Sequence, residues 1–167
     1  AYNENLEGYG YDPDLARQLL AESKYGPNLE NFGKPIILTT AGSFGSSVSL
    51  DMEVILAMWE KNLEIKVETL QTAFATYLQD LIKRRFEMFQ IGWIADYPDP
   101  ENFLDLLFHS KSNNNHTAYN NQQVDGLLER ARVEPREDVR YQLYQEAEQL
   151  IVRDAPWIPL WYSGEQY

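Results

Sequence analysis

The chain has 167 residues, of which 44% are hydrophobic and 24% charged, as is usual for a globular protein with a real core. Its formal net charge of -12 argues against a nucleic-acid or anionic membrane partner, because both would require a basic surface. There is no cysteine, which excludes disulfides and thiolate chemistry, and no apolar run approaches the roughly 20 residues that span a bilayer.

The first half of the chain predicts helices alternating with strands. The expected elements are a helix over 11–26, a strand over 34–42, a helix over 43–62 and a half-exposed strand over 63–70. Asp12 is a favourable N-cap, and Pro13 suits the first helical position. Because a crossover of about twenty residues joins the two strands, we expect them to form a parallel βαβ pair.

The second half predicts mostly helices. The expected elements are a helix over 72–85, a third strand over 86–94, helices over 100–108, 124–133 and 136–154, and an edge strand over 155–164. Between them lies a polar, Asn-rich loop that turns or stays mobile, with a glycosylation-type Asn-His-Thr motif at Asn115. Trp59, Trp157 and Trp161 are expected in the core. The fold class predicted is α/β.

Three loops are candidates for a binding site, because ligands of open α/β sheets bind beyond the carboxyl ends of the strands, and parallel strands place these loops at one edge. The loop after the second strand runs into "QTAF". The loop after the first strand, "AGSFGSS", contains Ser43, and a helix beginning there could receive an anion. Its serines are equally typical of helix caps, and it lacks the Gly-Lys-Ser/Thr ending of a P-loop. The loop after the third strand is "GWIADYPDP".

In the loop after the third strand, Asp96 lies between Trp93 and Tyr97. A carboxylate that is partly desolvated by such neighbours gains from a cationic partner, such as the ammonium group of a ligand. The alternative is a turn cap, which is common for an aspartate near a proline such as Pro98. The residues alone leave both interpretations open.

An enzyme would need a reactive constellation. The acids that could supply the carboxylate pair of a glycoside hydrolase are Asp96, Asp99, Glu101 and Asp105. Acids are expected in a turn and in a first helical turn anyway, so this pattern is weak. His109 and His116 do not have a familiar metal-ligand spacing, and neither a metal nor a cofactor is expected.

Several stretches resemble the family 5 extracellular solute-binding proteins, the peptide- and nickel-type receptors of ABC importers. They are "DPDLARQLLAESKYG", "FEMFQIGWIADYPDPENFLDLLFHS", "YNNQQVDGLLERA" and "REDVRYQLYQEAEQLIVRDAPWIPLWY". The resemblance implies a two-lobed, periplasmic-binding-protein-like (type II) fold with a mixed sheet and helices on its faces. Residues 1–167 would form a single ligand-binding lobe, a fragment of a receptor about three times as long.

The resemblance also implies a function. The receptor would be non-enzymatic and would bind oligopeptides in the cleft between its lobes. It would be extracytoplasmic, either periplasmic or a cell-surface lipoprotein. Its partners would be a peptide or other small solute, the transmembrane permease and the remaining lobe of the same chain, with no nucleic acid.

By the same resemblance, Asp96 stands where peptide-binding members meet the α-ammonium of the peptide. Gly92 and Ile94 stand where the backbone can pair with an extended peptide, a form of β-augmentation. Trp93 stands where an aromatic side chain lines a pocket. These three roles come from the resemblance and remain expectations.

Phe74 stands where many members have a tryptophan, so it keeps an aromatic wall but lacks an indole N–H. Ser43 lies in a loop that approaches the ligand in the family. Gln90 replaces a basic residue that meets the ligand carboxylate in some peptide-binding members. The identity of the ligand is therefore left undecided. An oligosaccharide stacked on Trp93, Phe74 and Tyr97 is one alternative, and a nickel chelate is another.

Overall fold

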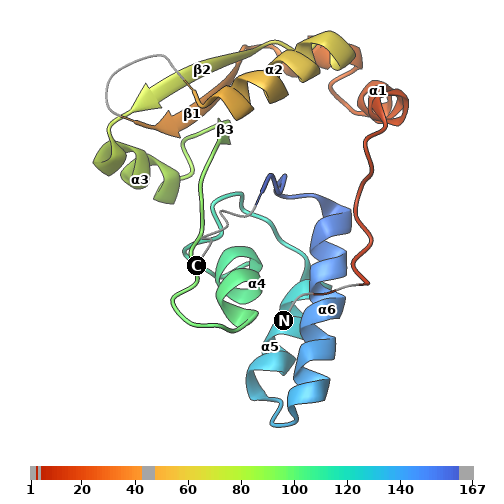
Figure 1. Cartoon of the computed structure of the whole chain (residues 1–167), viewed down its shortest axis with the longest axis vertical. Helices are drawn as coiled ribbons and strands as arrows, with labels where there is room; N and C mark the ends of the chain where they lie inside the picture. Colours follow the sequence, from red (N-terminus) through yellow and green to blue (C-terminus); the bar gives the residue numbers. More distant parts are fainter. Residues whose placement is uncertain (1–2, 4, 43–47, 162–167) are drawn as a thin grey trace. The chain divides into compact units, whose positions relative to one another are not determined.

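The computed structural model describes residue 3, residues 5–42 and residues 48–161 (Figure 1). By their internal contacts these residues form two compact units. We name them the sheet unit, Gly10–Gly92, and the helical unit, Ala1–Tyr9 together with Trp93–Tyr167. Each unit buries hydrophobic residues of its own. That residues 1–167 form a single lobe of a larger receptor stays a prediction.

The sheet unit contains a parallel three-stranded sheet. Its strands are β1 (Ile36–Ala41), β2 (Val67–Thr72) and β3 (Met88–Phe89), in the order β2-β1-β3. β1 pairs with β2 from Ile36 opposite Val67 to Ala41 opposite Thr72, so the predicted parallel pair is confirmed. Leu38 and Thr39 are both buried, and consecutive residues of a strand point to opposite faces. β1 is therefore covered on both faces at its centre, as predicted.

The described helices of the sheet unit are α1 (Pro13–Glu22), the short 3-10 helix η1 (Pro27–Phe32), α2 (Leu50–Leu63) and α3 (Phe74–Ile82). Two of these four, α1 and α2, begin at a side-chain cap. The Asp12 carboxylate accepts the Leu15 N–H at 2.9 Å, which confirms Asp12 as an N-cap. At α2 the Ser49 hydroxyl accepts the Met52 N–H at 3.4 Å. Each cap satisfies one of the N–H groups that a helix start leaves unbonded.

Two strand predictions are wrong in their bounds. The predicted strand over 63–70 loses its first residues to α2, because the N–H of Glu64 still bonds to the Glu60 carbonyl and closes the last helical turn. The predicted strand over 86–94 forms ladder pairs only at β3, followed by a single bond from the Gln90 N–H to the Thr39 carbonyl at 3.3 Å. The last ladder pair joins Phe89 to Thr39, two residues before β1 ends at Ala41.

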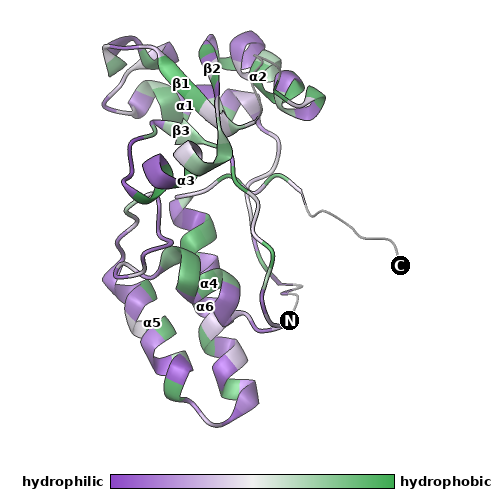
Figure 2. Ribbon diagram, turned by 90° about the vertical axis from the view of Figure 1, so that its left-hand side faces the viewer, coloured by the Kyte–Doolittle hydropathy of each residue, from purple (hydrophilic) through white to green (hydrophobic). Residues whose placement is uncertain are grey.

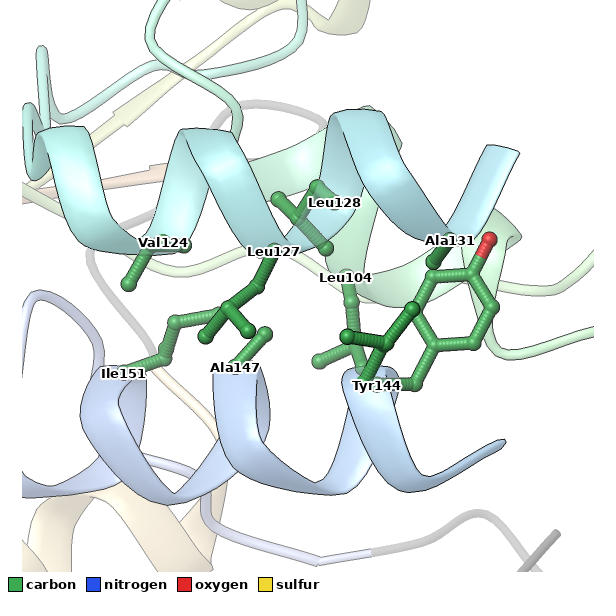
Figure 3. Close-up of a cluster of buried hydrophobic side chains, with 9 residues drawn as sticks. Leu104, Val124, Leu127, Leu128, Ala131, Tyr144, Ala147 and Ile151 are labelled. Atoms are coloured by element: carbon green, nitrogen blue, oxygen red, sulfur yellow. The ribbon is translucent and has the colours of Figure 1, made fainter. Parts of the chain in front are cut away.

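The helical unit is built on three helices, α4 (Glu101–Phe108), α5 (Gln122–Val133) and α6 (Glu137–Asp154). Their apolar faces meet in one core, in which side chains of α5 and α6 point toward each other (Figure 3). The core residues are Leu104, Val124, Leu127, Leu128, Ala131, Leu143, Tyr144, Ala147 and Ile151. Hydrophilic (purple) and hydrophobic (green) residues alternate along α5 and α6, as expected for amphipathic helices (Figure 2). The predicted core positions Leu143, Ala147 and Ile151 are confirmed.

The first residues of the chain belong to the helical unit because they bond to α6. The N–H of Glu7 donates to the side-chain oxygen of Gln149 at 3.0 Å, and the Gln149 amide donates back to the Glu7 carbonyl at 2.8 Å. The Tyr9 hydroxyl donates to the Arg153 carbonyl near the end of the helix at 2.7 Å. With the bond from the Asn3 amide to the Glu148 carboxylate at 3.1 Å, four hydrogen bonds tie this segment to α6.

The predicted edge strand over 155–164 is absent from its described part, residues 155–161. Ala155 ends α6 in the left-handed conformation, and the two following prolines lack the N–H groups of a ladder. The three described strands are all parallel, so the mixed sheet expected from the resemblance is not seen among them. Trp161 is 52% exposed, so its core assignment is wrong, whereas Trp157 is half-buried and packs edge-on against Phe108 at 5.4 Å.

The Asn-rich loop is organised around Asn115, whose side chain is fully buried. The Asn115 amide donates to the carbonyls of Tyr119 at 2.7 Å and His109 at 3.3 Å, and its oxygen accepts the Tyr119 N–H at 3.1 Å. The turn interpretation of this loop is therefore confirmed. The amide nitrogen of the Asn-His-Thr motif is also inaccessible to a modifying enzyme in the folded chain. Within the described ranges, no helix has the length and apolar character needed to cross a membrane.

We expect Asn115→Ala to lower the free energy of unfolding by about 2–4 kcal/mol, because it leaves buried backbone groups of the loop without partners. Urea unfolding followed by circular dichroism measures this loss. The matched control is Asn113→Ala, since Asn113 is exposed in the same loop. Equal unfolding midpoints for the two variants would contradict the role given to Asn115.

Candidate functional site

The segment Trp93–Asp99, which we call the arch, leads from the sheet unit into α4. Its first residue is fixed by the indole N–H of Trp93, which donates to the side-chain oxygen of Asn102 at 2.9 Å. Asn102 lies in the first turns of α4 and is fully buried. Buried polar atoms are costly unless they are hydrogen-bonded, so this contact satisfies the Trp93 N–H and the Asn102 oxygen, although not the Asn102 amide nitrogen.

The last residue of the arch is fixed by the Asp99 carboxylate. It accepts the N–H of Glu101 at 3.0 Å, and the Asp99 carbonyl accepts the N–H of Asn102 at 3.1 Å, which together start α4. The guanidinium of Arg140 on α6 binds the same carboxylate through both terminal nitrogens, with Nη1 at 3.0 Å from Oδ1. A bidentate pair of this kind fixes orientation as well as distance.

Between these two anchors the arch is exposed. Ile94 is 88% exposed, and Asp96 is exposed as well. The Tyr97 hydroxyl donates to the Glu101 carboxylate, and this hydrogen bond raises the pKa of Tyr97. The Asp96 carboxylate has no hydrogen bond or ion pair with any residue that the structure describes. The capping role that the sequence allowed for Asp96 is filled by Asp99.

The sequence-predicted site residues fall on both units. Trp93, Ile94 and Asp96 lie together on the arch, whereas Gly92 and Phe74 belong to the sheet unit. Phe74 is the first residue of α3 and is 64% exposed, and Gly92 is exposed. Ser43 lies outside the described residues. The ligand-binding roles of all six remain predictions, and for Trp93 the structure adds an anchoring role to the expected one.

The end of β3 is held by Tyr77 of α3. Tyr77 is buried on α3, and its hydroxyl donates to the Gln90 carbonyl at 2.7 Å. Its ring stacks on Phe86 at 5.1 Å, and burial raises its pKa to about 12. The backbone of Gln90 is therefore fixed by Tyr77 on one side and by Thr39 of β1 on the other.

The anchors Asn102 and Arg140 were missed by sequence reasoning. For Asn102 a signal existed, because an amide within the apolar pattern "NFLDLLF" needs a hydrogen-bond partner. The indole N–H of Trp93, nine positions earlier, could supply one. For Arg140 there was none, since it is separated from Asp99 by 41 positions. Only the packing of α4 against α6 brings the two together.

An open pocket of about 390 Å³ lies beside the arch within the helical unit, but its charged groups are already engaged with one another. Its lining residues are Tyr97, Asp99, Glu101, Arg132, Arg140 and Tyr144. Arg132 binds Asp105 through two nitrogens at 2.5 and 2.6 Å, which raises the pKa of Arg132. Among the described residues, no cluster of three or more His, Asp or Glu side chains could hold a metal ion.

Comparison with known proteins decides the family. The model of the "Bacterial extracellular solute-binding proteins, family 5 Middle" matches residues 1–115. The chain belongs to this family. The resemblance noted from the sequence is thereby confirmed, as is the α/β class.

Named relatives place the chain among family 5 receptors. It is 31% identical over 167 residues to heme-binding protein A of Haemophilus influenzae, covering 98% of this chain and 30% of that protein. It is 24% identical to the oligopeptide-binding protein OppA of Bacillus subtilis, covering 99% and 31%. The structure of DppA from Helicobacter pylori in complex with the peptide STSA matches with a TM-score of 0.80 and 28% identity, covering 95% and 30%. The chain thus spans about 30% of the length of these relatives.

Membership of family 5 also bears on catalysis. The family consists of solute-binding proteins of ABC importers, so the expectation of a non-enzymatic protein is confirmed at the level of the family. The glycoside hydrolase alternative loses its basis in the site as well. Asp99 and Asp105 are each held by an arginine, and Glu101 is bonded to Tyr97.

We expect Tyr77→Phe to lower the free energy of unfolding by about 1 kcal/mol at neutral pH, because the Gln90 carbonyl loses its donor. The pKa of Tyr77 is raised from 10.0 to about 12, so the unfolded chain ionises first as the pH rises. The stabilisation by Tyr77 is therefore complete below pH 10 and falls between about pH 10 and 12, by up to ~1.4 kcal/mol per pH unit.

Urea unfolding at neutral pH and at about pH 11 measures both effects, and the gap between wild type and Tyr77→Phe should narrow at the higher pH. Tyr25→Phe, in the same unit, is the matched control. A gap that stays constant across this range would show that Tyr77 is not the group that titrates.

Proposed function

We propose that this chain is one lobe of the substrate-binding component of an ABC importer that takes up oligopeptides. The ligand binds in the cleft between this lobe and the remaining lobe of the complete receptor. The receptor works outside the cytoplasm, either in the periplasm or as a cell-surface lipoprotein, and delivers its ligand to a transmembrane permease. The printed names of several relatives, which are oligopeptide-, dipeptide- and murein-peptide-binding proteins, support this choice of ligand.

The observation that carries the proposal is the free carboxylate of Asp96. Its neighbour Asp99 takes the helix cap and the arginine, whereas Asp96 has no partner among the described residues and is exposed on an arch fixed at both ends. A carboxylate without a structural role is available to a ligand. The α-ammonium of a peptide is the group that it would bind most strongly, through a charge-assisted hydrogen bond.

Five further residues are assigned to the ligand on the family resemblance. The exposed backbone at Gly92 and Ile94 pairs with an extended peptide, since neither residue lies in a strand ladder. Trp93 and Phe74 supply aromatic surface for peptide side chains, and Ser43 approaches the ligand from the loop after β1. Closure of the two lobes is a hinge motion, and the ligand shifts the balance toward the closed form by contacting both lobes.

A second candidate ligand is heme, favoured by the similarity to heme-binding protein A. The two histidines of this chain do not favour axial coordination. His109 and His116 are both buried, and His109 is further bonded at both ring nitrogens, to Glu129 and to the N–H of Lys111. Mass spectrometry of material that co-purifies with the complete receptor separates the outcomes: peptides support the proposal, whereas heme, an oligosaccharide or a nickel chelate contradicts it.

We expect Asp96→Asn in the complete receptor to weaken peptide binding by more than about a hundredfold, because losing one partner of a desolvated ion pair costs on the order of 3–5 kcal/mol. Calorimetry with a pool of tri- to pentapeptides measures this. N-acetylation of the same peptides should weaken wild-type binding by a similar factor and leave binding by the variant unchanged.

The matched control is Asp51→Asn, which removes the same charge from an exposed position on α2. Its affinity should equal that of wild type. Wild-type affinity in Asp96→Asn would refute the assignment of Asp96 as the ammonium ligand.

A further inference from the structure

The arch between its anchors has little structure of its own. Residues 94–98 lie in neither a helix nor a strand, and within the arch the N–H of Asp99 bonds to the Tyr97 carbonyl at 2.9 Å. Pro98 restricts one backbone angle but supplies no N–H donor. The position of Asp96 therefore depends on what holds the two ends, Trp93 and Asp99.

The anchor at Trp93 is the side chain of Asn102, which also interacts with the Tyr97 hydroxyl of the arch. Asn102 is fully buried on α4, where an apolar side chain would ordinarily pack. Its side-chain oxygen accepts the Trp93 indole N–H at 2.9 Å, so the buried amide fixes the start of the arch. A leucine at position 102 would fill the same space and provide no acceptor.

The anchor at Asp99 connects the arch to the main core. Arg140 lies on α6, next to the core residues Leu143 and Tyr144, and its guanidinium is 5.4 Å from the centre of the Tyr144 ring. The side chains of Arg140 and Asp99 are only 24% and 22% exposed. A partly buried bidentate pair holds its geometry better than the usual surface ion pair, which contributes little.

From these contacts we infer that Asn102 and Arg140 are positioning residues for the ligand site: neither touches the ligand, and together they hold the arch so that Asp96 meets the ligand ammonium. The inference rests on the proposed function for its ligand. Its structural part, anchoring of the arch, does not depend on any ligand.

The experiment uses two charge-neutral double variants of the complete receptor. The test variant combines Arg140→Gln with Asp99→Asn, and the matched control combines Arg132→Gln with Asp105→Asn. Each removes one bidentate arginine–aspartate pair from the helical unit, and only the first pair holds the arch. Because both charges of a pair are neutralised, no unpaired Asp99 is left near Asp96 to attract the ammonium by itself.

The first readout is the ratio of affinities for free and N-acetylated tri- to pentapeptide pools. We expect the test variant to reduce this ratio about tenfold, as is typical when residues that orient a ligand group are lost. The control variant should lower stability and leave the ratio unchanged. Asn102→Leu should reduce the ratio as the test variant does. Arg140→Lys alone should reduce the ratio less than the test variant does, because a lysine ammonium keeps the positive charge but cannot bind the Asp99 carboxylate through two nitrogens.

The second readout is hydrogen–deuterium exchange at residues 94–97 without ligand. Exchange should be faster in the test variant and in Asn102→Leu than in wild type, and unchanged in the control variant. An unchanged affinity ratio together with unchanged exchange would overturn the inference. If wild type does not distinguish the two peptide pools, the proposed function fails, and exchange alone decides whether Asn102 and Arg140 anchor the arch.

Discussion

The bidentate pair between Arg140 and Asp99 joins three parts of the helical unit at one point. Through Arg140 it reaches α6 and the hydrophobic core, through the backbone near Asp99 it starts α4, and through the arch it fixes the exposed segment that carries Asp96. Moving α6 relative to α4 would break the pair. The hydrophobic core and the candidate site therefore depend on the same packing, although they share almost no residues.

The two aspartates of the arch differ sharply in their partners. Asp99 is surrounded by donors that hold it in place, whereas Asp96, three positions earlier, has no partner among the described residues. An acid already bonded to an arginine has little attraction left for a ligand. Residues 93–99 contain no lysine or arginine, and the net charge of the chain is -12, so the chain as a whole favours the approach of a cationic group.

Much of the fold could be predicted from the sequence because its causes are local. Asp12 and Ser49 cap helices through their own side chains, and the parallel order of β1 and β2 follows from the length of the connection between them. The errors arose where a distant partner decides. β3 pairs with β1 only at Met88 and Phe89, a limit that its own sequence does not indicate. Among residues 155–161 no strand follows α6, which ends at Ala155 in the left-handed conformation.

The candidate site, like the fold, has some features that the local sequence predicts and others that depend on distant residues. Asp96 could be predicted as a site residue because the residues next to it in the sequence, and the family resemblance of the same short stretch, both point to it. The arginine that holds Asp99 lies 41 positions away, and no periodicity or spacing connects the two. Asn102 lay within reach of sequence reasoning, since an amide among apolar residues requires an explanation.

The burial of Asn115 has a practical consequence for anyone who produces this protein in a eukaryotic secretory pathway. The sugar-transferring enzyme needs the amide nitrogen, which in the folded chain is bonded to the carbonyls of Tyr119 and His109. Only chains that have not yet closed this loop can be modified, and a sugar attached there prevents the loop from closing. The fraction of chains carrying a glycan would thus record how slowly the loop folds.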